Sequence, residues 1–235
     1  MKRRYFLFLA LLPLLYWPFS SKKLDFKNLA LEDLKKMEEA GNSLESLYRQ
    51  NPHQEIFGSI LPSWTRLDEN IHYPKKDVIN KESCSQYYYH SHRKGEHGHF
   101  HIFLREKGFP DHIERKNLKG FVQLVAISLD RSGYPSRLFL TNQWVTNEET
   151  RSQHELNELL PYFKLDTSNL TNAWIESMLV LFKPQIQKLW EKREAFFKSS
   201  LKDQEEMLKD RSIEILAEEK ISLSKQLKAV REALN

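Results

Sequence analysis

Five of the nine histidines in this 235-residue chain fall within one short segment, and they are the side chains best placed to do chemistry: His90, His92, His97, His99 and His101. Side chains alternate across a β-strand, so residues two positions apart share one face. A turn at Lys94 and Gly95 predicts an antiparallel hairpin made of the two halves of the segment. Its register pairs His92 with His97, His90 with His99 and Tyr88 with His101. The sequence therefore predicts that all five imidazoles lie on one face.

The opposite face of this predicted hairpin is apolar and carries Tyr87, Tyr89, Phe100 and Ile102. A face of this kind packs on a hydrophobic core. We therefore expect a hairpin with one buried face, while its histidine face forms the floor of a site.

Metal binding is the chemistry that this pattern favours. Neutral imidazole is a common ligand for zinc, copper, nickel and iron. Directly paired side chains of an antiparallel hairpin lie about 5 Å apart, so several ring nitrogens can converge on one ion. The first hypothesis is a divalent-metal site for zinc or iron, with four ligands: His90, His92, His99 and His101. The predicted catalytic residues are Glu96, as carboxylate ligand or general base, and His97, in support of the ligands; the reaction would be metal-assisted activation of water or dioxygen.

Other interpretations of the histidines stay open. One is a metal-free pocket for acid–base chemistry or phosphate binding. Another is a structural ladder of hydrogen bonds with Tyr88, Gln86 and the segment that carries His72 and Asp77. In that case the protein is a non-catalytic scaffold or binding module tethered to the cell envelope. The spacing HxHxxxE at 90–96 resembles half of the cupin metal motif, and HxHxH at 97–101 is similar to the histidine-triad signature, but neither has its family's surroundings.

The first residues have the layout of a secretory signal. Lys2, Arg3 and Arg4 precede an uncharged apolar stretch at residues 5–17. We expect residues 1–21 to be a signal peptide or an N-terminal membrane anchor, with residues 5–17 in the membrane. The stretch is shorter than the roughly 20 apolar residues that span a bilayer. The predicted location is the cell envelope, either periplasmic or anchored in the inner membrane; the alternative is a cytoplasmic protein whose first helix has an apolar cap.

The charge of the chain is nearly balanced, with 36 basic and 32 acidic residues and a net charge of +4. The basic residues form no single stripe and the sequence contains no familiar recognition motif, so we expect no nucleic-acid partner. Cys84 is the only cysteine, so an intrachain disulfide is excluded and stability must come from packing.

Residues 22–184 are predicted to form one α+β domain. Apolar residues at helical spacing predict helices near 29–49, 148–163 and 169–183. Two strands are expected after the hairpin, at 121–129 and 137–141, and prolines between 60 and 81 predict an extended arm. The result is an antiparallel meander of about four strands with helices packed on one face. The arm and the loop at 141–147 are expected to cover the histidine face.

Residues 185–235 contain no glycine or proline and are rich in charge, which predicts a long helical extension. Part of it spaces apolar residues four and then seven positions apart, as in a heptad stripe: Phe197, Leu201, Leu208 and Ile215. This spacing is typical of a coiled coil, through which a homo-oligomer or a partner helix would assemble. A solvated helix packed once against the domain is the alternative.

Several short motifs resemble those of a bacterial domain family of unknown function. They are HYP at 72–74, QYYYHxHR at 86–93, EHGHFH at 96–101, TNxWVT at 141–146 and LFxPQI at 181–186. The resemblance covers residues 31–190 and implies no assigned reaction. The hydrophobic leader and the charged extension are additions to the usual form of that family.

Overall fold

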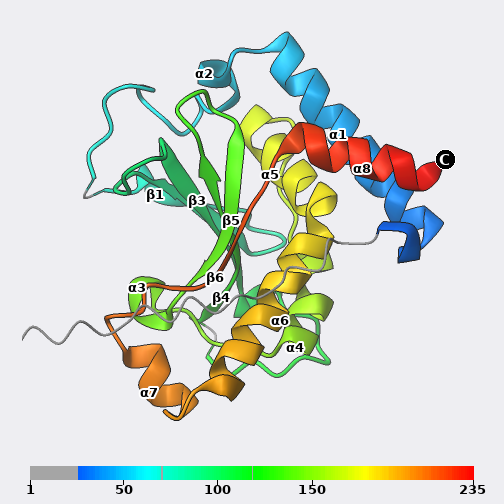
Figure 1. The fold of residues 1–235 in the computed structure, drawn as a ribbon. Helices are drawn as coiled ribbons and strands as arrows, with labels where there is room; N and C mark the ends of the chain where they lie inside the picture. The colour runs from blue at the N-terminus through cyan, green and yellow to red at the C-terminus, as the bar shows by residue number, and fades with distance from the viewer. Residues whose placement is uncertain (1–25, 70, 118) are drawn as a thin grey trace, which may run out of the picture.

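The computed structural model describes residues 26–69, 71–117 and 119–235, and its centre is a six-stranded antiparallel sheet (Figure 1). The strands lie side by side in chain order: β1 (Tyr73–Ile79), β2 (Ser85–His90), β3 (Gly98–Arg105), β4 (Phe121–Leu129), β5 (Pro135–Thr141) and β6 (Ile215–Lys220). The α+β class and the antiparallel meander are confirmed. The predicted number of about four strands is too low, because the expected arm contains β1 and the expected tail helix contains β6.

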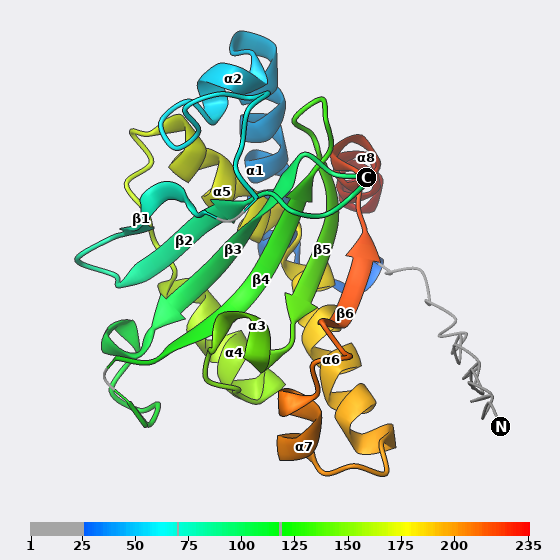
Figure 2. The ribbon, with the colours of Figure 1, turned by 90° about the vertical axis from the view of Figure 1, so that its left-hand side faces the viewer.

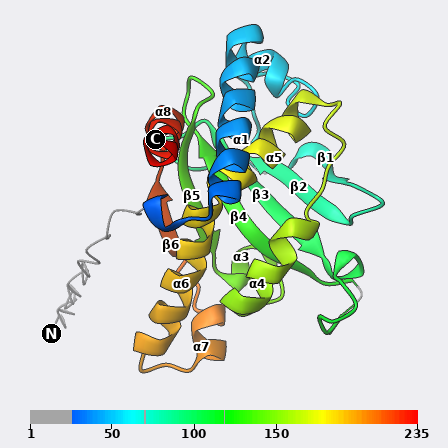
Figure 3. The same ribbon diagram turned by 90° about the vertical axis from the view of Figure 1, so that its right-hand side faces the viewer.

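Helices cover one face of the sheet, as predicted (Figures 1 and 3). The main ones are α1 (Leu31–Gln50), α4 (Gln153–Leu159), α5 (Leu170–Leu181) and α6 (Lys183–Ser199). The apolar face of the hairpin packs against them: the Phe100 ring lies 5.4 Å from that of Trp174, and Tyr87 donates a hydrogen bond to Asn172 at 2.7 Å. Trp190 of α6 donates to the carbonyl oxygen of Leu124 at 2.9 Å. The hydrophobic core lies on this side of the sheet and holds β2 and β3, the strands that carry the histidines, in place.

The other face of the sheet is covered only in part, by α3 (Gln143–Thr146) and by the arm before β1 (Figure 2). A bulge in β4 decides which side chains reach this face. Ile102 pairs with Val125 and Phe103 pairs with Gln123, so Leu124 is an extra residue in β4. Because of this extra residue, Gln123 lies on the histidine face although Val125, two positions later, lies on the core face.

The C-terminal segment is not the predicted long helix. It contains α7 (Gln204–Lys209), β6 and α8 (Leu223–Leu234). β6 pairs with β5, and α8 lies along α1, where a Cβ atom on Gly41 would lie 2.5 Å from Leu227. The coiled-coil prediction is therefore wrong: the segment completes the edge of the sheet and covers α1 within one chain. A homo-oligomer formed through this segment stays a prediction.

The remaining short helices are α2 (His53–Ile56), η1 (Phe26–Asn28), η2 (Glu106–Gly108) and η3 (Leu160–Tyr162). Within the part of the chain that the structure describes, no helix combines the length and the apolar character needed to cross a bilayer. The predicted leader at 1–21 lies outside the described residues, so export and membrane contact through residues 5–17 stay predictions.

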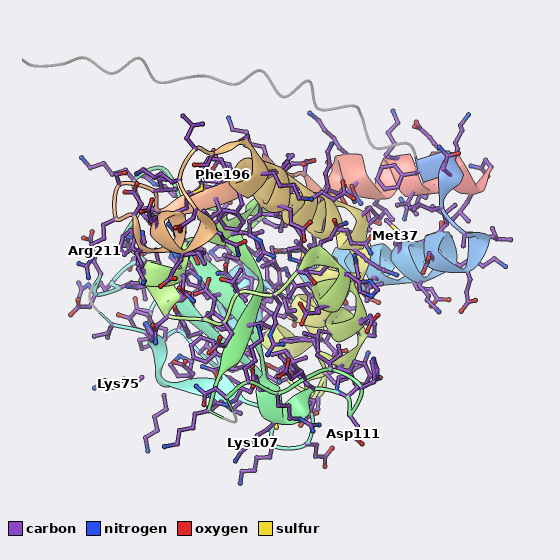
Figure 4. The ribbon with its side chains drawn as sticks, turned by 90° about the horizontal axis from the view of Figure 1, so that it is seen from below. Met37, Lys75, Lys107, Asp111, Phe196 and Arg211 are labelled. Carbon is purple, nitrogen blue, oxygen red and sulfur yellow. The ribbon has the colours of Figure 1, made fainter. Side chains whose placement is uncertain are left out.

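Basic side chains are dispersed over the surface. Lys75 of β1 and Lys107 after β3 are exposed and project outward at separate places in Figure 4. Arg211, labelled in the same figure, has its guanidinium carbon 5.9 Å from the centroid of the Trp144 ring.

Candidate metal centre

Strands β2 and β3 pair in the predicted register, with His90 opposite His99 and Tyr88 opposite His101. Gly95, in the turn between them, has a φ of +91°, a conformation that glycine adopts without strain. The turn and these two pairs are confirmed. Since Phe100 and Ile102 face the core, His99 and His101 point to the opposite face of the sheet.

Three of the four predicted ligands come together beside the end of this hairpin. His90, His92 and His99 each offer one ring nitrogen, and these three atoms lie within 4.8 Å of one another. Imidazole binds zinc at about 2.0–2.1 Å, which separates two nitrogens of a tetrahedral site by about 3.3 Å. The most widely separated pair of rings must therefore approach by at most about 1.5 Å on binding. His92 is exposed in the loop after β2, so it has room to make this movement.

The ring of His99 is oriented by a buried carboxylate. Its Nδ1 atom lies 2.6 Å from Oε1 of Glu96, whose Oε2 accepts a hydrogen bond from Arg137 at 2.9 Å. A carboxylate accepts hydrogen bonds, so Nδ1 carries the proton and Nε2 has the free lone pair. This Nε2 atom is buried and has no hydrogen-bond partner among the described residues. Histidine ligands of metals commonly have this arrangement of a carboxylate behind the ring.

His90 is fixed in a comparable way by the arm. Its Nε2 atom lies 2.9 Å from the carbonyl oxygen of Glu69. Because a carbonyl only accepts, Nε2 is the protonated nitrogen of the neutral ring, and the Nδ1 lone pair is left for a ligand. The arm therefore selects a metal-binding tautomer of His90.

His101 lies deeper, outside the group of three converging nitrogens. Gln123 accepts a hydrogen bond from the backbone N–H of Thr141 at 2.9 Å, which fixes the orientation of its amide. Its Nε2 atom therefore donates to Nδ1 of His101 at 3.0 Å. The neutral His101 ring then carries its proton on Nε2 and offers a hydrogen-bond donor there, not a lone pair.

Burial keeps these rings neutral. It lowers the pKa of His99 to about 4, and the hydrogen bond to Glu96 offsets only part of this effect. It also lowers the pKa of His90 and, to a greater extent, that of His101. Burial alone would raise the pKa of Glu96, but the hydrogen bond from His99 and the charge of Arg137 lower it to about 2. Near neutral pH the site thus has neutral imidazoles beside an ionised carboxylate, the forms that favour a cation.

The prediction that all five imidazoles share one face is wrong for His97. This ring stacks on Trp64 with 3.6 Å between centroids, its Nδ1 lies 2.6 Å from the Tyr89 hydroxyl, and its Nε2 lies 2.5 Å from the carbonyl oxygen of Trp64. Tyr89 belongs to the core face. The strand begins only at Gly98, so alternation does not extend to residue 97. Both nitrogens of His97 are engaged, and the residue fastens the arm to the hairpin.

A pocket of about 240 Å³ lies next to the three converging rings. The hairpin contributes His90, His92 and His101 to its walls, and the arm contributes His72, which stacks on Tyr88 with 3.7 Å between ring centroids. Trp144 and Val145 of α3 close another side, so the expected cover by the arm and the loop after β5 is present.

Two further residues of the pocket wall are Arg93 and Glu214, which form an ion pair. Glu214 is not among the predicted site residues, because it lies in the segment expected to be helical. The burial of β6 does not alternate, because Leu216 and its neighbour Ala217 are both buried while Glu218 is exposed, so the sequence has no clear strand signal there.

A larger cleft of about 480 Å³ lies elsewhere, between α1 and α5. Its walls include Leu29, Met37, Phe163 and Leu179, and none of its lining residues is a histidine. Size therefore does not favour the histidine pocket, whereas the converging ligand atoms do. The chemistry of the donor atoms decides in favour of the histidine pocket.

Together, the fold and the site define an α+β protein with a histidine pocket on the open face of an antiparallel sheet. Residues 38–221 match the family described as a domain of unknown function, DUF6969, and the chain belongs to this family. The resemblance inferred from the short motifs, to a family with no assigned reaction, is confirmed at this level. Its predicted end at residue 190 is too early, because the match extends to residue 221 and includes β6. Comparisons with curated proteins and with solved structures found no match.

Proposed function

We propose that the histidine pocket is a divalent-metal centre with His90, His92 and His99 as ligands. The observation that carries the proposal is the Nε2 atom of His99, a buried lone pair with no described partner, on a ring that offers one of three converging nitrogens. A buried acceptor left without a hydrogen bond costs about 1–3 kcal/mol. A bound cation removes this cost.

Zinc is the metal that this ligand set favours. Three imidazoles and one open position are typical of catalytic zinc sites, whereas non-haem iron usually takes two histidines and a carboxylate. Glu96 is turned toward His99 and Arg137, so it does not complete the iron set. Zinc bound by three protein ligands lowers the pKa of a bound water to about 7, which supplies a hydroxide nucleophile. Metal-assisted hydrolysis is therefore the reaction class that we propose, ahead of activation of dioxygen.

The roles of the two predicted catalytic residues change in this proposal. Glu96 positions His99 and raises the basicity of its Nε2 atom. His97 acts at a greater distance, because it holds Trp64 and with it the arm whose Glu69 carbonyl oxygen orients His90. His101 donates from its protonated Nε2 atom and is not a ligand.

Elemental analysis tests the metal site. Protein purified without a histidine tag and equilibrated with zinc is expected to retain about one equivalent, and H99A and H90A are expected to abolish this binding. H112A and H154A are matched controls, since both histidines are exposed and contact Glu158. E96Q is expected to weaken zinc binding roughly 10- to 100-fold, the range found for such supporting groups.

The outcome also separates the proposal from the structural alternative. A wild-type protein that retains no zinc, together with a large loss of melting temperature in H99A, would show that the histidines only stabilise the sheet. Hydrolysis of an activated ester by zinc-equilibrated wild type and H112A, but not by H99A treated in the same way, supports the reaction class. Equal rates in wild type and H99A contradict it.

We also propose that this centre works in the cell envelope. The support is the sequence of residues 1–21, where three basic residues precede an apolar stretch. Fractionation of cells that produce the full chain tests the location, and the mass of the mature protein tests cleavage. Recovery in the cytoplasm contradicts the proposal.

A further inference from the structure

Arg93 lies on the wall of the histidine pocket and has a hydrogen-bonding group that no described residue uses. Its Nε and Nη2 atoms both donate to Oε1 of Glu214, the former at 3.1 Å. Its Nη1 atom is buried and has no hydrogen-bond partner among the described residues. A guanidinium donates through all three nitrogens, so one third of this group is left for a ligand.

The guanidinium is held in a fixed place. Its side chain is only 13% exposed, and its central carbon lies 4.5 Å from the centroid of the Phe139 ring. Phe139 in turn contacts His99, with 5.2 Å between ring centroids. The unused donor is therefore anchored beside the ligand cluster, and a ligand that reaches it does not have to order a mobile side chain.

Charge balance predicts the sign of that ligand. Among the described residues that line the pocket, Glu214 is the only acidic one, and Arg93 already neutralises it. The charge of Glu96 is matched by Arg137. Three neutral imidazoles leave the double positive charge of a bound metal ion uncompensated, so an anion is favoured in the open position.

The pocket also limits the size and shape of the ligand. Its volume of about 240 Å³ equals that of about eight water molecules. Tyr88 and Trp144 provide two flat aromatic walls, and Arg93 is the only cation other than histidine among the described residues that line the pocket. The single free nitrogen of Arg93 and one open metal position match the two oxygens of a carboxylate better than the larger set of oxygens of a phosphate dianion.

We propose that the pocket binds a small organic carboxylate, with its charge shared between the metal ion and Arg93 and its body between the aromatic walls. The inference rests on the metal centre proposed above and names the substrate class of that site. Arg93 is then the residue that determines specificity for an anion.

Cobalt(II) in place of zinc gives the test an optical signal from the site. Benzoate and propionate are expected to change the visible spectrum of the cobalt protein with saturation, and benzamide, which has the shape of benzoate without its charge, is not. R93Q is expected to weaken benzoate binding roughly 10- to 100-fold, because it removes a charge-assisted hydrogen bond. R105Q is the matched control, since Arg105 bonds to Gln86 outside the pocket wall.

Variants of the ion pair sharpen the result. E214Q removes the competing carboxylate and frees Nε and Nη2 of Arg93, so benzoate is expected to bind about tenfold more tightly. If R93Q does not fold, R93K is tested in its place. Lysine keeps the positive charge but lacks the planar set of donors of a guanidinium, so benzoate binding is expected to weaken several-fold.

The two proposals fail in different ways. Protein that binds cobalt but responds equally to benzoate and benzamide, or equally in wild type and R93Q, overturns the carboxylate inference and leaves the metal centre in place. Tighter binding of inorganic phosphate than of benzoate overturns the assignment to carboxylates. Protein that binds no cobalt overturns the metal centre, and the carboxylate inference with it.

Discussion

The histidine hairpin and Glu214, the residue just before strand β6, both line one pocket, but different interactions hold these two regions in place. β3 is buried on both faces, and its partner β2 precedes it by a short turn. β6 is partly exposed, and its partner β5 lies far earlier in the chain. A hairpin closes a short loop and is encoded locally, whereas β6 depends on contacts that form only when the domain is assembled. The pocket wall therefore combines a hairpin that the local sequence encodes with a segment whose position depends on long-range contacts.

The TNxWVT element at 141–146 supplies the long-range contacts. The side chain of Asn142 donates to the carbonyl oxygens of Met207 and Ile213, at 2.9 and 3.0 Å. Trp144 donates to the same Ile213 carbonyl at 2.8 Å. These bonds hold the chain before β6 and bring Glu214 to the pocket, so this element positions the C-terminal segment and also forms one pocket wall.

Removal of residues 211–235 is expected to have the largest effect. The deletion exposes the edge of β5 and the core side of α1, where Leu227 and Val230 are 1% and 0% exposed. We expect loss of cooperative thermal unfolding, followed by circular dichroism, and loss of zinc binding. A truncated chain that melts like the full chain would show that the hairpin needs no long-range support.

A pair of leucine substitutions separates packing within the chain from a coiled coil. L227A is expected to cost about 2–5 kcal/mol of the free energy of unfolding, because it leaves a cavity between α8 and α1. L201A changes a residue of the predicted heptad that is 107% exposed, so a change within about 0.5 kcal/mol is expected. Urea denaturation measures the free energy of unfolding of both variants. A larger loss of this free energy in L201A than in L227A would support the coiled coil.

Much of the first region could be predicted from the sequence. Alternation and a glycine turn define the hairpin and its register, and the apolar run at 121–129 coincides with β4. The position of His97 could not be predicted, because alternation holds only inside a strand, and β3 begins one residue after this ring, which stacks on Trp64. The exclusion of His101 depends on Gln123, which faces it only because of a bulge.

The strand in the C-terminal segment, β6, could not be predicted for a related reason. The segment 204–234 has helical composition throughout, and α7 and α8 are indeed helical. Residues 215–220 form a strand because the open edge of β5 and the bonds from Asn142 outweigh a weak local preference. Glu214 enters the pocket only as a consequence of this tertiary contact.

The pH dependence of stability that Glu148 causes depends on how closely the C-terminal segment packs against this residue. This carboxyl is 7% exposed, lies beside a small cavity lined by Leu208 and Leu216, and has its pKa raised to about 7 by burial. Its ordinary value is 4.5, so the folded state binds a proton between about pH 4.5 and 7 that the unfolded state does not. Stability therefore falls as the pH rises through this window, by about 3 kcal/mol in total.

Substitution E148Q is expected to remove this part of the pH dependence. Urea denaturation at several pH values between 5 and 8 measures the difference in free energy of unfolding between wild type and variant. The contribution of the histidines is the same in both proteins and cancels in this difference. Parallel curves would mean that the C-terminal segment leaves Glu148 in contact with water.

The smallest effect is expected at the turn that connects β2 and β3. A Cβ atom on Gly95 meets no atom within 4 Å, so the cost of G95A comes only from the positive φ, about 1 kcal/mol. G95N is the matched control, because asparagine tolerates this conformation and is expected to cost less. Both variants are expected to keep zinc binding, since Glu96 and Glu69 orient His99 and His90 independently of the turn. A loss of zinc in G95A but not in G95N, at equal stability, would show that the turn itself sets the position of His92.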